Sequence, residues 1–286
     1  MEIYTDRLKF SELTLLDIST IAQISQDMAW NDTINLLARD DLSEAIFKHY
    51  GKGELYNYKE KLLRNGYNLK NISFKDVPQD MIPQNIWHIN FPQLSPPFLS
   101  SAQKYVNKAI EKRKETERQG YWLAIREINN KKLIGVIAIS TKSLKNDDGK
   151  NKIGHAGMFL HPDYQKKGIV SEANAVMIDF MYKYLFDKKG KKLDDNTFYY
   201  TTCHPLNIGS QKMQEKAGGI LDTSHTSANG KFEFYASRKQ QENSRLFNTP
   251  IKWTAYLDDH QVISSQTGSI YPLNKVTQIS QNYNGR

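Results

Sequence analysis

Two apolar runs separated by a short polar turn constrain the fold of this chain more than any other feature. Residues 121–128 (YWLAIREI) and 132–140 (KLIGVIAIS) are rich in β-branched and aromatic residues, and two asparagines lie between them. This pattern predicts an antiparallel hairpin. A third apolar run at 153–160 predicts another strand. The middle of the chain is therefore expected to form a sheet.

Helical and strand patterns surround this hairpin. Apolar residues at helical spacing predict helices at 14–28, 41–50, 54–64, 100–118, 171–186 and 207–217. Short runs rich in β-branched and aromatic residues predict further strands at 3–10, 197–203, 218–224 and 230–237. Ser100 and Ser101 are candidate N-caps of the helix at 100–118. This order of elements predicts an α+β fold, with helices on the faces of a mixed central sheet.

Two long segments fit this pattern poorly. Residues 30–98 are only weakly periodic and end in a Pro- and Asn-rich stretch, and irregular segments of this length inside a domain are more often functional than neutral. Residues 239–286 are rich in Gln, Asn and Ser without a period, which predicts a polar arm or a partly disordered extension. We expect one domain at 1–238, with 30–98 as an insertion, and a polar tail at 239–286.

The composition narrows the function classes. A single cysteine, Cys203, rules out an internal disulfide framework and suits a reducing compartment. No apolar run reaches the roughly 18 residues of a transmembrane helix, and the N-terminus lacks a basic-then-apolar export signal. We therefore expect a cytoplasmic protein with no membrane partner. The net charge of +8 favours anionic partners, but the lysines form scattered pairs, so nucleic acid is not expected.

The stretch HPDYQKKGIVSEA, residues 161–173, joins a predicted strand to a predicted helix. Backbone N–H groups at a helix N-terminus attract anions, and Gly168 lets the backbone approach one closely. Lys166 and Lys167 add positive charge. A plain strand-to-helix turn with solvated lysines explains the same residues, and this loop alone favours that simpler explanation.

Several segments in the same order resemble a known family. They are QKKGIV (165–170), SEA (171–173), GHAGM (154–158), NIGS (207–210), EKAGG (215–219) and TDRL (5–8). Together they resemble the GNAT superfamily of acetyl-CoA-dependent N-acyltransferases, and SEA is similar to the Thr-Glu-Ala of the branch that modifies ribosomal-protein N-termini. The resemblance is continuous over about 120–238, patchy over 1–30 and absent from the tail.

The resemblance implies a GNAT fold that binds acetyl-CoA as co-substrate and requires no metal. The backbone of Met158, Phe159 and Leu160 would pair with the pantetheine arm, and one of their N–H groups would polarise the thioester carbonyl. The other implied cofactor-binding residues are Gln165, Lys166, Lys167, Gly168, Ile169, Val170, Ser171, Asn207 and Ser210.

Two positions depart from the family pattern. Val170 stands where the family has Gly or Ala, which puts a close approach of the last loop N–H to the pyrophosphate in doubt. Gln214 stands where many relatives have a general-acid tyrosine. The tyrosine-acid mechanism is therefore in doubt for this chain, although the cofactor is not.

The candidate catalytic residues are His155 and Ser210. His155 would act as general base because it precedes the cofactor strand and titrates near neutrality, or it is a structural histidine in the sheet. Ser210 would donate to the leaving thiolate, or it caps a helix; Asn207 is open to the same two roles. His161, His204 and Glu172 are weaker candidates, and the two histidines lack metal-ligand spacing. Cys203 needs no covalent role, because the amine attacks directly.

We therefore expect an N-acetyltransferase that transfers an acetyl group from acetyl-CoA to a primary amine. The acceptor would be a small molecule, a protein N-terminus or a lysine, and the 30–98 insertion would line the acceptor side. Two alternatives stay open: a non-catalytic acyl-CoA-binding module, and an RNA- or ribosome-associated protein. A homodimer is also left open.

Overall fold

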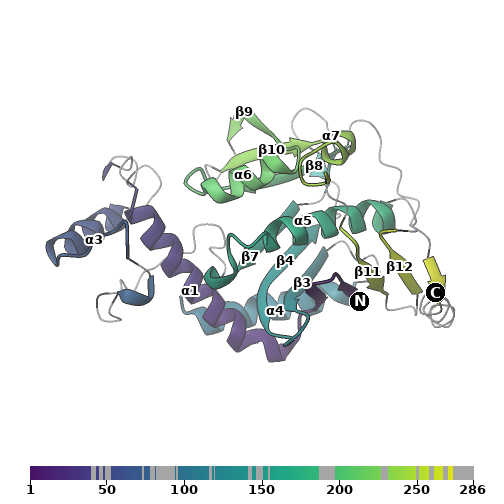
Figure 1. Ribbon diagram of the computed structural model, residues 1–286, viewed down its shortest axis with the longest axis horizontal. Helices are drawn as coiled ribbons and strands as arrows, with labels where there is room; N and C mark the ends of the chain where they lie inside the picture. Colours follow the sequence, from purple (N-terminus) through teal and green to yellow (C-terminus); the bar gives the residue numbers. More distant parts are fainter. Residues whose placement is uncertain are drawn as a thin grey trace, which may run out of the picture.

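The computed structural model gives the architecture of the chain (Figure 1). The described residues are 1–39, 53–72, 74–77, 96–115, 120–140, 144–145, 151–153, 155–186, 197–226, 231–248, 251–257, 261–266 and 270–272, with single residues between them. The predicted helix at 41–50 lies almost entirely outside them.

The larger sheet has eight strands in the order β13-β12-β11-β1-β2-β3-β4-β7. Their bounds are β1 Glu2–Tyr4, β2 Leu8–Glu12, β3 Gly120–Glu127, β4 Leu133–Ser140, β7 His155–Leu160, β11 Thr254–Tyr256, β12 Gln261–Ser264 and β13 Ile270–Pro272. The hairpin of β3 and β4 confirms the prediction. The single strand predicted at 3–10 is wrong, because Leu8 N–H donates to Thr5 Oγ1 and folds this segment into two antiparallel strands.

A second sheet contains β5 (Leu144–Lys145), β6 (Asn151–Ile153), β8 (Thr197–Cys203), β10 (Phe232–Ala236) and β9 (Ile220–Thr226) in that order. β6 runs parallel to β8 and its last pair is Ile153 with Tyr199. Immediately afterwards β7 pairs with β4 in the other sheet. The strand predicted at 153–160 is therefore divided between two sheets, which form a fork at this point.

Helices cover both faces of the larger sheet (Figure 1). α1 (Ile18–Leu37) and α4 (Phe98–Arg113) pack on one face around Phe159, in a cluster with Leu13, Ala102 and Val136. α5 (Ile169–Phe180), which continues as a π-helix at Met181–Phe186, packs on the other face. α6 (Ile208–Lys216) and α7 (Arg238–Glu242) belong to the second sheet.

The boundaries of α1 and α4 differ most from the prediction, and α4 ends at Arg113 rather than at residue 118. α1 follows a short 3-10 turn, Leu15–Asp17, and runs nine residues beyond the predicted end at residue 28, to Leu37. Its last turns pack with α3 (Gly53–Arg64) around Trp30, Leu37 and Leu62, which explains the extension. α4 begins at Phe98 with Pro97 at its N-cap. The prediction that Ser100 and Ser101 cap this helix is therefore wrong.

The tail prediction is wrong for the residues that the structure describes. β11 pairs with β1, and β12 pairs with β11, so both strands extend the larger sheet. Trp253, Ala255 and Ile263 are buried in the same cluster as α5. Two strands of three and four residues give only a weak alternation of apolar residues in the sequence. The polar residues between them weaken this strand pattern further.

Candidate cofactor and active site

The loop between β7 and α5 has an unusual backbone. After a 3-10 turn at Pro162–Tyr164, Lys166 (φ 61°) and Gly168 (φ 76°) both lie in the left-handed region. Gly168 is the N-cap of α5, and Glu172 N–H donates to Gly168 O as the first helical bond. The N–H groups of Ile169, Val170 and Ser171 therefore have no acceptor within the helix. They lie at the positive end of the α5 dipole, which favours an anion.

Side chains from α1 fix the start of this loop. Gln165 Nε2 donates to Leu160 O (3.2 Å), and Asn31 Nδ2 donates to Gln165 Oε1 (3.4 Å). His161 Nδ1 accepts from Asp163 N–H (3.2 Å), so its Nε2 carries the proton and donates to Asp27 Oδ2 (3.2 Å). His161 thus holds the loop against α1. The sequence offers no local signal for Asp27 or Asn31, because only tertiary packing brings them here.

Glu172 fixes the loop from the other side. Its carboxylate accepts hydrogen bonds from Thr5 Oγ1 (2.6 Å) and Arg7 Nε (2.8 Å). Arg7 Nη1 also reaches Lys167 O (3.4 Å). Glu172 is buried, whereas about half of the Arg7 side chain is exposed. Thr5 and Arg7, at the turn between β1 and β2, therefore clamp the first turn of α5 onto the sheet, which gives Glu172 a structural role.

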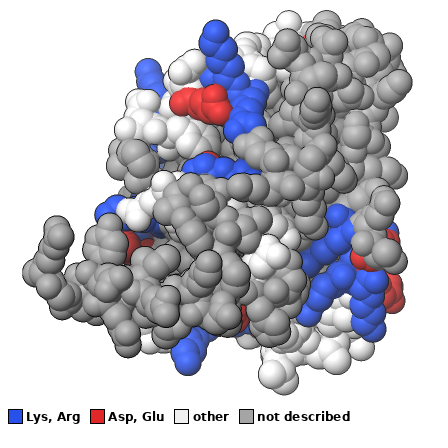
Figure 2. Space-filling model, turned by 90° about the vertical axis from the view of Figure 1, so that its right-hand side faces the viewer, with Lys and Arg blue, Asp and Glu red and all other residues white. Residues whose placement is uncertain are grey.

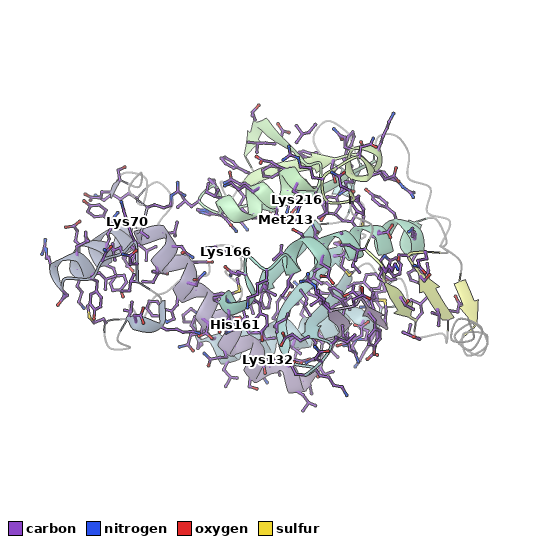
Figure 3. All side chains as sticks on the ribbon, viewed as in Figure 1. Lys70, Lys132, His161, Lys166, Met213 and Lys216 are labelled. Carbon is purple, nitrogen blue, oxygen red and sulfur yellow. The ribbon has the colours of Figure 1, made fainter. Side chains whose placement is uncertain are left out.

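Basic side chains surround the helix N-terminus. Lys216 Nζ on α6 donates to Ser171 Oγ (3.2 Å), and Ser171 Oγ also contacts Met213 Sδ (3.6 Å). Lys166 is exposed, and Lys167 lies over the Tyr164 ring. Figure 3 shows Lys166 beside the start of α5, with Met213 and Lys216 on the neighbouring α6. The predicted loop residues and the C-terminal half of α6 thus lie around one electropositive site.

β7 is the last strand of the larger sheet, so among the described strands one of its edges is unpaired. His161 N–H donates to Ile134 O, so these two residues form a hydrogen-bonded pair. From this pair, residues of β7 whose backbone groups bond to β4 alternate with residues whose backbone groups point away from it. The backbone groups of Phe159 then face β4, and those of Met158 and Leu160 face the open edge. Of the three residues predicted to pair with a pantetheine arm, Met158 and Leu160 fit by this geometry. Phe159 does not, and its side chain is buried against α1 and α4.

The start of α6 contains Asn207 and Ser210. Asn207 is the N-cap, and its Oδ1 accepts from Ser210 N–H (3.0 Å). Ser210 also hydrogen-bonds to the thiol of Cys203, while burial raises the pKa of that thiol to about 11. Cys203 is therefore neither ionised nor exposed at neutral pH. The helix-cap alternative for Asn207 thus holds, and a hydrogen bond from Asn207 to a cofactor amide stays a prediction.

Gln214 lies in a different environment from the loop. It is buried and lines a small cavity with Tyr199 and Thr201 of β8 and Phe234 of β10. The residues of α6 that contact Ser171 are Met213 and Lys216 instead. An acid role at the Gln214 position is thus disfavoured by both its chemistry and its surroundings.

The remaining predicted residues are dispersed. The backbone of His155 lies opposite Ser140 on β4, but its side chain lies outside the described part of the structure. His204 Nδ1 accepts from Leu206 N–H (3.1 Å), which is a local turn contact.

Within the described residues, no group of three or more His, Cys, Asp or Glu side chains could hold a metal. No described helix is long and apolar enough to cross a bilayer.

The family model of the acetyltransferase (GNAT) domain matches residues 79–220, which include β7, the loop, α5 and α6. The chain carries a GNAT acetyltransferase domain. The fork between β7 and β8 and the β7–α5 loop both lie inside this domain. No curated protein matches the chain in sequence.

Solved structures that resemble this chain share little of its sequence. The ribosomal-protein-S5-alanine acetyltransferase from Vibrio fischeri is 16% identical, with a TM-score of 0.43, over 84% of this chain and 98% of its own. Mycobacterium smegmatis RimJ, in complex with CoA-disulfide, is 10% identical, with a TM-score of 0.46, over 86% and 91%. A GNAT-family acetyltransferase from Bacillus anthracis is 15% identical, with a TM-score of 0.42, over 82% and 96%.

Proposed function

We propose that this chain is an N-acetyltransferase that uses acetyl-CoA to acetylate a primary amine. The observation that carries the proposal is the β7–α5 loop, where two left-handed residues lead into the N-terminus of α5. The N–H groups of Ile169, Val170 and Ser171 would bind the pyrophosphate, and Lys166, Lys167 and Lys216 would add charge.

The open edge of β7 supplies the second part of the cofactor site. A pantetheine arm that runs from the loop along this edge would pair with the backbone of Met158 and Leu160, as an added strand pairs with a sheet edge. One of these N–H groups would polarise the thioester carbonyl. The thioester would then lie toward the fork between the two sheets.

The contacts of the 30–98 insertion support a role for it on the acceptor side. Lys75, in the 3-10 turn Phe74–Asp76, forms an ion pair with Asp163 (2.9 Å), and it lowers the pKa of that carboxyl. Leu206, which follows β8, packs against the α1–α3 cluster. The insertion thus contacts both arms of the fork beyond their carboxyl ends. A cover at this place would restrict which amines reach the thioester.

Proton transfer from the acceptor is the remaining step of the proposed reaction. The amine attacks as the free base, so the chain must remove a proton from the acceptor ammonium. His155 is our candidate base, acting directly or through water. The departing thiolate is a good leaving group, so Ser210 or water is sufficient to protonate it.

Calorimetry with coenzyme A, followed by a thiol-release assay over peptides with free N-termini and small amines, tests this function. We expect coenzyme A binding and acetyl transfer to one class of amine. Coenzyme A binding without transfer to any amine would favour a non-catalytic acyl-CoA module. Absence of coenzyme A binding would overturn the proposal.

An RNA-binding role has weaker support. Figure 2 shows the basic side chains of one face in separate groups, some of them beside acidic side chains. A steep fall of RNA affinity with salt would be the sign of that alternative.

A further inference from the structure

One amide side chain of α5 is buried without a hydrogen bond. Asn174 is 2% exposed, and its Nδ2 has no hydrogen-bond partner among the described residues. Buried polar groups of proteins are normally paired, because an unpaired one destabilises the chain. By contrast, Ser171 Oγ accepts from Lys216, and Glu172 is paired with Arg7. Asn174 therefore has hydrogen-bonding capacity for a group from outside the chain.

The turn of the helix places Asn174 on the side of α5 that faces the fork. Each residue turns an α-helix by about 100°, so Asn174 lies roughly 200° from Glu172 and nearly opposite to it. Glu172 points to Thr5, at the turn between β1 and β2 in the middle of the larger sheet. The opposite side of α5 therefore faces the end of this sheet, where β7 is the last strand.

Asn174 also lies between the two surfaces that enclose the fork. Ser171, three residues earlier, contacts Met213 of α6. Met177, three residues later, is buried in the cluster on the larger sheet. Residues three apart are neighbours on a helix surface, so Asn174 lies between the contact with α6 and the contact with the sheet. Figure 1 shows α5 in this position, with the larger sheet on one side and α6 on the other.

The helix runs in the direction that a pantetheine arm would take. β6 is parallel to β8 and is followed directly by β7, so α5, which comes between β7 and β8, runs back along the sheet. Both α5 and the open edge of β7 thus lead from the loop toward the fork. Asn174 is about 6 Å further along the helix axis than Val170, whose N–H would bind the pyrophosphate. The first amide of the arm follows the pyrophosphate after a short carbon chain, so this depth suits it.

We propose that Asn174 hydrogen-bonds an amide of the pantetheine arm and so positions the acetyl donor in the fork. An amide offers one carbonyl and one N–H, which complement the N–H groups and the carbonyl of the Asn174 side chain. The apolar carbons of the arm would leave the buried side chain unpaired. This inference rests on the proposed function. It adds that the chain recognises the donor by its arm and not by its phosphates alone.

Calorimetry with coenzyme A and with ADP, which has the pyrophosphate but no pantetheine arm, tests the inference. Asn174→Leu removes the amide at nearly constant volume. We expect it to weaken coenzyme A binding about tenfold and to leave ADP binding unchanged. The melting temperature of the ligand-free variant should be unchanged or higher, because an apolar group replaces an unpaired buried amide.

Ser244→Ala is the matched control. Ser244 Oγ is also buried without a hydrogen-bond partner in the described part of the chain, but this residue follows α7 and is not part of α5. Both affinities of this variant should match those of the wild type. If Asn174→Leu does not fold, Asn174→Ala, which also removes the amide, provides the same comparison.

Two results would overturn the inference alone. One is a ratio of coenzyme A affinity to ADP affinity that is the same in the Asn174 variant and in the wild type. The other is an equal weakening of both ligands, which would mean that the substitution disturbs the phosphate loop. A wild-type chain that does not bind coenzyme A would overturn the proposed function, and the inference with it.

Discussion

The guanidinium of Arg7 binds the carboxylate of Glu172 across 165 residues of sequence, and so ties the first hairpin to the first turn of α5. Thr5 donates to the other carboxylate oxygen, and a further Arg7 nitrogen reaches the carbonyl of Lys167 within the loop. The backbone that would hold the pyrophosphate therefore depends on residues far from it in sequence.

Replacing Arg7 with alanine tests this dependence. Glu172 would stay buried without its charged partner, which typically costs about 1–3 kcal/mol. We expect a lower melting temperature and an approximately tenfold weaker affinity for coenzyme A in calorimetry. Lys9→Ala removes an ion pair with Glu2 on the same hairpin and serves as the control, with little change expected in either measurement. Unchanged coenzyme affinity in Arg7→Ala would show that the clamp does not position the loop.

Gly168→Ala tests the left-handed conformation at the helix N-cap. A Cβ at this position would meet nothing closer than Arg7 Nη2 at 3.9 Å, so the cost is backbone strain of about 1–2 kcal/mol rather than a clash. We expect the chain to fold with weaker coenzyme A binding, and Gly168→Glu to abolish binding because its anion would replace the pyrophosphate.

Gly66 is a matched control for this substitution. It has a similar φ of +82°, a Cβ added to it would meet nothing within 4 Å, and it follows α3 far along the chain from the loop. Gly66→Ala should cost similar stability and leave coenzyme A affinity unchanged. Equal affinities for both variants would refute the phosphate-loop assignment.

Removing residues 245–286 should lower the melting temperature strongly. Trp253 is buried, packs edge-on against Phe180 at 5.8 Å, and donates from Nε1 to Asp179 Oδ2 (2.9 Å). Trp253→Ala alone should cost about 3–5 kcal/mol in urea unfolding. Lys252→Ala, an exposed neighbour, is expected to have little effect. A tail deletion with an unchanged melting temperature would contradict the packing seen here.

Cys203 should resist alkylation in the native chain. The pKa of the Cys203 thiol is raised to about 11 in the folded chain, against an ordinary value of 9.0. Between pH 9 and pH 11 the folded chain therefore keeps the thiol proton, whereas the unfolded chain loses it. Stability from this group is thus present below pH 9 and is lost as pH rises toward 11. Mass spectrometry should find slow labelling by iodoacetamide at pH 8 and rapid labelling in urea. Cys203→Ala should retain acetyl transfer, and loss of turnover in this folded variant would indicate a covalent role.

His155→Ala should lower turnover by roughly 10²-fold at neutral pH if His155 is the general base. The defect should shrink at high pH, where the acceptor deprotonates unaided, while coenzyme A affinity stays near wild type. Ser210→Ala should cost less at every pH. Full activity of His155→Ala at pH 7 would move the base elsewhere.

The sequence was sufficient for the elements whose patterns are local. The β3–β4 hairpin, α6 and β8 lie close to their predicted bounds, because their apolar spacing and capping residues are contained within each segment. The clamp at Glu172 and the contacts of Asp27 and Asn31 with the loop were not predictable, since each joins distant segments.

The position of β1 affects how the chain can fold during synthesis. β1 lies between β2 and β11, so Ile3 pairs with Phe10 on one side and with Ala255 on the other. The hairpin of β1 and β2 can form as soon as it leaves the ribosome, but its outer edge stays uncovered until residue 256 has been made. At about 5–20 residues per second this delay lasts on the order of ten seconds to a minute. An uncovered strand edge can pair with other chains. Nascent copies of this protein should therefore need chaperones until β11 has been made, although the β1–β2 hairpin itself is a local structure.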